Sequence, residues 1–168
     1  MKARPFAVGY RKGSGEGLVY GGILAALLAG FVAAYNHEPG LYIISTLALM
    51  MSFYYFPLIE KGQPQLGANA DGLFIGGIGF IGWAEIAQLE VFNTAVRSIR
   101  LSTLIVHLHR PLADVVAKPE KAPWWRKPMA RPYRRKGDMR IEIALHPLQG
   151  APEQIFERLK AFRPDLGG

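Results

Sequence analysis

The chain of 168 residues contains no cysteine. This absence excludes a disulfide scaffold, thiolate catalysis, iron–sulfur clusters and cysteine-based zinc sites. Charged residues are also sparse, at 20% of the chain, compared with about 25% in an average soluble protein. Acidic residues are fewer still, with 13 Asp and Glu against 20 Lys and Arg, although half of the residues are hydrophobic. A chain that is both apolar and basic must separate the two kinds of residue along its length.

Two long stretches without a charged residue lie near the N-terminus, at Leu18–Tyr35 and Leu41–Ile59. Each is long enough to cross the hydrocarbon core of a bilayer as a helix, which takes about 17–25 residues. Only five residues separate them, so two spans would have to be antiparallel neighbours. A signal peptide has a shorter apolar core and no second span behind it. The sequence therefore predicts a two-helix transmembrane hairpin over residues 18–60.

The distribution of positive charge predicts the orientation of this hairpin. Four basic residues precede the first stretch and Lys61 follows the second, whereas the connecting residues Asn36–Gly40 contain no Lys or Arg. Because Lys and Arg flanking a span favour the cytoplasmic side, we expect both termini to be cytoplasmic, with residues 1–17 as a tail. Small residues recur every four positions on the first span, at Gly22, Ala26 and Gly30, and this spacing predicts close helix packing.

Residues 63–168 read as a cytoplasmic domain of strands closed by one helix. Apolar alternation and turn residues predict strands near 73–75, 80–83, 85–92, 98–109 and 140–145. Pro152 and Glu153 suit the first turn of a helix, and Ile155, Leu159 and Phe162 form one apolar stripe along it. We expect this stripe to pack on the strands.

These segments resemble a group of bacterial membrane proteins in which a two-helix hairpin precedes a pleckstrin-homology-like cytoplasmic domain. The resemblance rests on the stretches Asp71–Ile75, Gly79–Ile86, Ile141–Ile143 and Pro152–Phe162. It implies a small, partly open β-barrel capped by a C-terminal helix, in an integral protein of the bacterial inner membrane. It implies a fold and no activity, because most members of the group have no assigned function.

The segment Pro111–Lys136 departs from that pattern. It contains five prolines, which disfavour regular helix or sheet, and it reads as an insertion into the domain. Residues 118–136 carry eight Lys and Arg against Glu120 alone, so their net charge equals the +7 of the whole chain. We call residues 118–136 the basic arm. The arm also contains aromatic residues, and its candidate contact residues are Trp124, Trp125, Arg126, Lys127, Arg131, Tyr133, Arg134 and Arg135.

Such a mixture suits two kinds of surface. Lys, Arg and Trp bind the headgroup layer of an anionic membrane, and Trp and Arg also anchor protein–protein interfaces. A plain solvated loop is the third interpretation. Nucleic acid is not expected as a partner, because stacking of bases requires aromatics on a rigid platform.

Catalytic and metal-binding patterns are not found. His107 and His109 share a face of a strand, but a metal would need a distant third ligand. No serine lies in a nucleophile motif, and Gly76–Gly79 lacks the helix and Lys-Ser/Thr of a phosphate loop. We therefore expect no enzyme, cofactor, metal or small-molecule substrate.

Two functions remain. The first is a non-catalytic accessory or scaffold subunit, docked on the cytoplasmic face of a larger membrane protein complex. The second is a stand-alone module that binds the anionic membrane surface through the basic arm.

Overall fold

The computed structural model describes residues 4–60, 62–96, 99–120 and 123–166. The chain divides into two compact units. The hairpin unit consists of Lys12–Lys61 and Pro123–Ala130, and the β unit consists of Met1–Arg11, Gly62–Ala122 and Arg131–Gly168. The layout is therefore α+β, with a helical hairpin.

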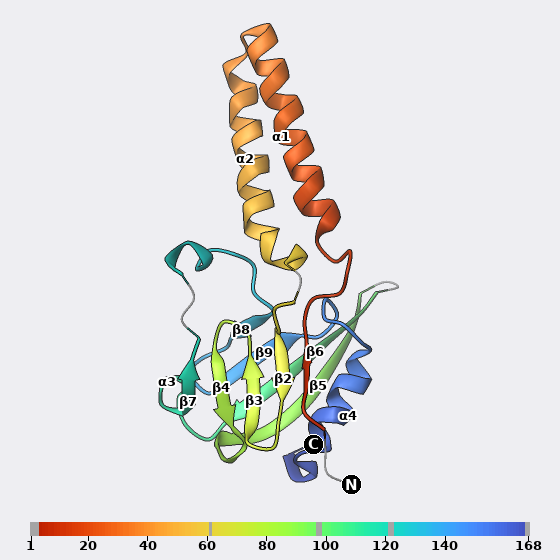
Figure 1. Ribbon diagram of the computed structural model, residues 1–168, viewed down its shortest axis with the longest axis vertical. Coiled ribbons are helices and arrows are strands. Elements are labelled where there is room, and N and C mark those ends of the chain that lie inside the picture. The colour runs from red at the N-terminus through yellow and green to blue at the C-terminus, as the bar shows by residue number, and fades with distance from the viewer. Residues whose placement is uncertain (1–3, 61, 97–98, 121–122, 167–168) are drawn as a thin grey trace. The chain divides into compact units, whose positions relative to one another are not determined.

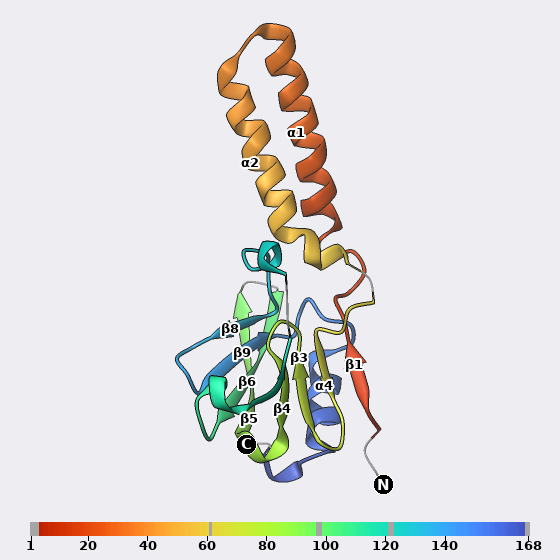
Figure 2. The same cartoon turned by 60° about the vertical axis from the view of Figure 1, so that its left-hand side comes forward.

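The hairpin unit contains α1 (Glu16–Asn36) and α2 (Pro39–Tyr55), which lie side by side (Figures 1 and 2). His37 ends α1 in the left-handed region, at φ 55°, and Pro39 begins α2. The 3-10 helix η1 (Phe56–Ile59) continues α2. Glu16–Asn36 and Pro39–Ile59 each span 21 residues and are apolar enough to cross a membrane. The helices thus begin and end close to the predicted spans, and the connection is shorter than Asn36–Gly40.

The β unit contains two antiparallel sheets, one lying against the other (Figure 1). The first has the order β1 (Phe6–Val8), β2 (Leu66–Ala68), β3 (Gly72–Ile75), β4 (Gly79–Gly82), β7 (Val116–Pro119). The second has the order β5 (Ile86–Val96), β6 (Ile99–Leu108), β9 (Arg140–Ala144), β8 (Tyr133–Arg135). Short helices complete the unit: η2 (Trp83–Glu85), α3 (Leu112–Val115), α4 (Pro152–Lys160) and η4 (Pro164–Leu166).

The core of the β unit comes from alternate residues of both sheets. The side chains with at most 1% exposure include Leu66, Leu73, Ile75, Ile81, Leu89, Leu104, Ile141 and Ile143. Helix α4 adds Ile155 and Leu159, which are 2% and 0% exposed. Phe162, just beyond α4, stacks on Trp83 with ring centroids 6.0 Å apart. The apolar stripe of the helix is therefore buried within the β unit, as its periodicity predicts.

The N-terminal tail differs from the sequence interpretation, because it contains β1. Residues Phe6–Val8 pair with β2, and Tyr10 forms an isolated bridge with Leu148. The sequence interpretation treated residues 1–17 as a tail, because a strand of only three residues carries too little alternation to predict. Strands before and after the hairpin therefore belong to one sheet.

The prediction that neither helix nor sheet runs through Pro111–Lys136 is wrong at both ends of that segment. α3 and β7 occupy its first part, and β8 occupies its last. The prolines sit where they remove no ladder hydrogen bond that the fold needs: Pro111 precedes α3, Pro119 ends the edge strand β7, and Pro132 precedes β8. β7 also passes so close to Gly79 that a Cβ there would lie 2.1 Å from the Lys118 carbonyl oxygen.

Candidate functional site

The centre of the basic arm belongs to the hairpin unit. We call Pro123–Ala130 the tryptophan segment; it contains the 3-10 helix η3 (Trp124–Arg126). At one end of the segment, the Ala130 N–H donates a hydrogen bond of 2.8 Å to the Tyr54 carbonyl oxygen. In its middle, the Arg126 guanidinium lies 2.5 Å from the Glu60 carboxylate, and both side chains are 25% exposed. The segment is thus attached to the end of α2 and to the residue after η1.

The local sequence explains this attachment. The last carbonyl groups of a helix have no partner within the helix, and that of Tyr54 is one of them. Ala130 supplies the missing donor from a residue 76 positions further along the chain. Pro123 precedes η3 as its N-cap residue, with the extended dihedral angles that a proline adopts readily. Met129, next to the bonded Ala130, is 5% exposed.

The two tryptophans differ in exposure. Trp124 is 80% exposed, whereas Trp125 is 39% exposed and has the Arg126 guanidinium 5.1 Å from its ring centroid. Lys127 follows on the exposed surface. Trp124 is therefore an exposed indole close in sequence to Arg126 and Lys127, on a segment bonded to the end of an apolar helix. This arrangement can bind a surface that offers both apolar area and negative charge.

The remaining predicted contact residues lie elsewhere, in the β unit. Tyr133 is only 7% exposed, and its hydroxyl donates to the Gly77 carbonyl oxygen at 3.0 Å. Arg131 donates to that same hydroxyl at 2.8 Å. Tyr133 therefore joins the end of the arm to the β3–β4 turn, and a contact of this residue with a partner or with lipid stays a prediction. A tyrosine at the start of a buried strand carries no sequence signal that separates the two roles.

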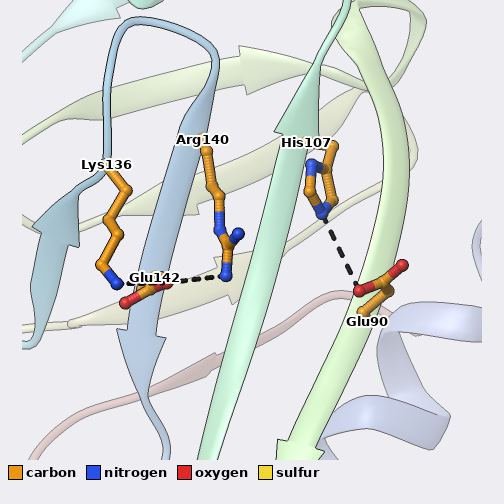
Figure 3. Close-up of polar contacts among 5 residues, drawn as sticks. All are labelled: Glu90, His107, Lys136, Arg140 and Glu142. Atoms are coloured by element: carbon orange, nitrogen blue, oxygen red, sulfur yellow. Dashed lines mark hydrogen bonds and ion pairs between the residues drawn. The ribbon is translucent and has the colours of Figure 1, made fainter.

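Arg134 and Arg135 are exposed on β8, at the edge of the second sheet. Figure 3 shows polar contacts among five side chains of this sheet and the loop beside it. Glu142 lies 2.8 Å from Arg140 and 3.7 Å from Lys136, and His107 Nε2 lies 3.8 Å from the Glu90 carboxylate. His107 thus has a carboxylate beside it, and among the described residues no three metal-ligating side chains cluster.

The eight basic residues of the arm are therefore divided. Arg126 and Lys127 belong to the hairpin unit, and Lys121 lies outside the described residues. The other five belong to the β unit: Lys118, Arg131, Arg134, Arg135 and Lys136. The arm does not form one continuous binding surface within either unit.

The predicted small-residue face of α1 lies against α2. Gly22 and Ala26 face it, and a Cβ on Gly22 would lie 2.2 Å from Ser52 Oγ. Ser45 donates a hydrogen bond of 2.8 Å from Oγ to the Ala26 carbonyl oxygen, and a Cβ on Gly30 would lie 3.3 Å from the same Ser45 Oγ. These residues hold the hairpin together.

Sequence reasoning missed Glu60 and Tyr54, which hold the tryptophan segment. An acidic residue directly after a long apolar stretch was a weak signal for Glu60, whereas a backbone carbonyl such as that of Tyr54 gives none. Sequence reasoning also missed the Glu85–Arg110 pair. Two hydrogen bonds from the Arg110 guanidinium hold the pKa of the Glu85 carboxyl below its ordinary value.

Comparison with protein-family models, with curated proteins and with solved structures found no match to this chain.

Proposed function

We propose that the protein is a non-catalytic membrane-surface module, anchored by its hairpin and held to anionic headgroups by the tryptophan segment. The observation that carries the proposal is the attachment of this segment to the end of α2, through the Ala130–Tyr54 hydrogen bond and the Arg126–Glu60 ion pair. An exposed indole fixed at the end of a membrane span lies at the depth that tryptophan prefers. Lys and Arg near a membrane surface each add about 1 kcal/mol of attraction to anionic lipid.

The hairpin and the sheet support the membrane topology of this proposal. β1 precedes α1 and β2 follows α2, and the two strands pair residue by residue from Phe6–Ala68 to Val8–Leu66. Strands of one sheet must lie on one side of the membrane, so both ends of the hairpin emerge on the same side. The basic residues flanking the spans favour the cytoplasmic side of a bacterial inner membrane. Two sheets and a C-terminal helix are compatible with a pleckstrin-homology-like domain.

Depth-dependent fluorescence quenching tests the proposal. The full chain is placed in three kinds of nanodisc that all contain anionic lipid: one without a label, one with a nitroxide at the lipid headgroup, and one with a nitroxide deep in the acyl chain. The tryptophan emission is then compared among the three. We expect the headgroup label to quench a large component of the tryptophan emission, and the Trp124→Phe variant to lack this component. Trp83 is 5% exposed and supplies the unquenched internal reference. Equal emission with and without the headgroup label would overturn the proposal.

The accessory subunit is the second candidate, and a different observation favours it. Phe92 is 61% exposed on β5, an edge strand of eleven residues. Large exposed aromatics on an unpaired strand edge suit contact with another protein. Purification of the full chain from native membranes in mild detergent distinguishes the candidates. A stoichiometric partner that is lost in a Phe92→Ser variant supports the accessory subunit.

A further inference from the structure

The edge strands of the two sheets differ in how well they are protected against pairing with another chain. Proteins protect an exposed edge by keeping its strand very short, or by placing charged residues or proline on it. β1, at one edge of the first sheet, has only three residues, and β7, at the other edge, contains Lys118 and Pro119. β8, at one edge of the second sheet, exposes Arg134 and Arg135. Each of these three edges therefore carries a feature that opposes further pairing.

The fourth edge strand, β5, lacks this protection over its second half. β5 has eleven residues and, among the described residues, pairs with β6 alone (Figure 1). Leu89 is 0% exposed, but the side chains of residues 92–94 are exposed, and Phe92 reaches 61%. The stretch Val91–Val96 contains no charged residue, proline or glycine. Because alternate residues of an edge strand direct their N–H and C=O groups away from the neighbouring strand, this half of β5 offers an uncharged edge for pairing.

The order of residues on β5 suits pairing with a second copy of the same strand. Paired antiparallel strands that are related by a two-fold axis have one residue that lies opposite its own copy. If this residue is Phe92, the two phenyl rings form a cross-strand aromatic pair, and Glu90 lies opposite Thr94 of the second copy. If it were Glu90, two like charges would lie opposite each other, which is unfavourable. The register centred on Phe92 therefore pairs the aromatic residues and keeps the carboxylates apart.

We propose that β5 pairs antiparallel with β5 of a second copy, centred on Phe92, and so joins two four-stranded sheets into one sheet of a dimer. The outer edges of the joined sheet are the two β8 strands, whose exposed Arg134 and Arg135 stop further growth. Pairing over so few residues is weak between free chains. Two hairpins in one bilayer raise the effective concentration of the strands, and this step rests on the membrane anchoring of the proposed function.

Disulfide cross-linking tests the proposal, because the chain contains no cysteine of its own. The purified full chain is placed in phosphatidylcholine liposomes at low protein density, oxidised with copper phenanthroline and analysed on a non-reducing gel. We expect Phe92→Cys to form a linked dimer, since residues directly opposite each other have Cβ atoms about 4.5–5.5 Å apart. The double variant Glu90→Cys, Thr94→Cys retains Phe92 and is expected to form a linked dimer as well.

Thr94→Cys alone is the matched control on the same strand. In the proposed register its two copies lie four residues apart along the strands, or about 14 Å, which is beyond the reach of a disulfide. Arg134→Cys, exposed on β8, measures random collision in the membrane. Both controls are expected to cross-link about tenfold more slowly than Phe92→Cys, because only pairing raises the local concentration of the thiols.

Two results would overturn the proposal. If Thr94→Cys cross-linked as fast as Phe92→Cys, the dimers would come from collision. If Phe92→Cys and the double variant both stayed monomeric, β5 would not pair with a second copy, and its free edge would be left to a different protein. Retention of the chain in the liposomes during alkaline extraction reports membrane anchoring separately, so a failure of anchoring is distinguished from a failure of pairing.

Discussion

Leu159 offers a direct measure of how firmly α4 is packed. Its side chain is 0% exposed and projects into the β unit beside Ile155. Leu159→Ala removes three carbon atoms, and each buried methylene contributes about 0.8 kcal/mol by transfer alone. The cavity left behind adds to this loss, so the free energy of unfolding is expected to fall by about 2–5 kcal/mol. Gln154→Ala on the exposed side of the same helix is the control and should change stability by less than about 0.5 kcal/mol.

The chain supplies its own reporter for this measurement. It has three tryptophans, and replacing Trp124 and Trp125 with Phe leaves Trp83 alone. Trp83 stacks on Phe162 just beyond α4, so its emission reports whether this end of the chain is docked. With a urea dependence of about 2 kcal/mol/M, the unfolding midpoint of Leu159→Ala should fall by about 1–2.5 M. A midpoint that matches the Gln154→Ala control would refute the packing described for α4.

Two further results are expected. Gly22→Ala should lower the free energy of unfolding of the hairpin by about 1–3 kcal/mol, as measured by titration with sodium dodecyl sulfate in mixed micelles. The reason is that the new Cβ would lie 2.2 Å from Ser52 Oγ. Gly21→Ala, which meets nothing within 4 Å, should not lower it, and equal effects of the two variants would contradict the described helix contact. The Glu85 carboxyl has a lowered pKa in the folded state, so its contribution to stability is present above its ordinary pKa of 4.5 and is lost as the pH falls below that value. Urea titrations at several pH values across this range measure the free energy of unfolding. Acidification should lower it less in Glu85→Gln than in the unchanged protein, and an equal fall in both would refute the role of Arg110.

The sequence predicted those elements best whose formation depends on one physical requirement. The two spans, the β3–β4 hairpin and α4 were predicted because apolar length, glycine turns and helical periodicity each leave a direct pattern. β1, β2, β7 and β8 were missed, because strands of three or four residues show too little alternation. Only pairing with neighbouring strands makes them strands.

The sequence predicted which types of residue form the candidate site, but not which residues contact one another in the fold. Trp124, Trp125 and Arg126 stood out by composition, whereas their attachment to Tyr54 and Glu60 joins positions more than sixty residues apart. Tyr133 stood out for the same compositional reason and proved to be buried. Residue content alone does not separate an aromatic that contacts a surface from one that fills a core.

The pairing of β1 with β2 sets an order of events during synthesis. β1 leaves the ribosome first, but its partner, Leu66–Ala68, is made only after both hairpin helices. Phe6–Val8 must therefore remain unpaired on the side of the membrane where translation continues until the hairpin has inserted. Leu148, which bridges Tyr10, comes later still. Residues 6–10 thus reach their final place only after Leu148 has been made, and a ribosome-bound chain arrested between the hairpin and Leu66 would leave them open to protease.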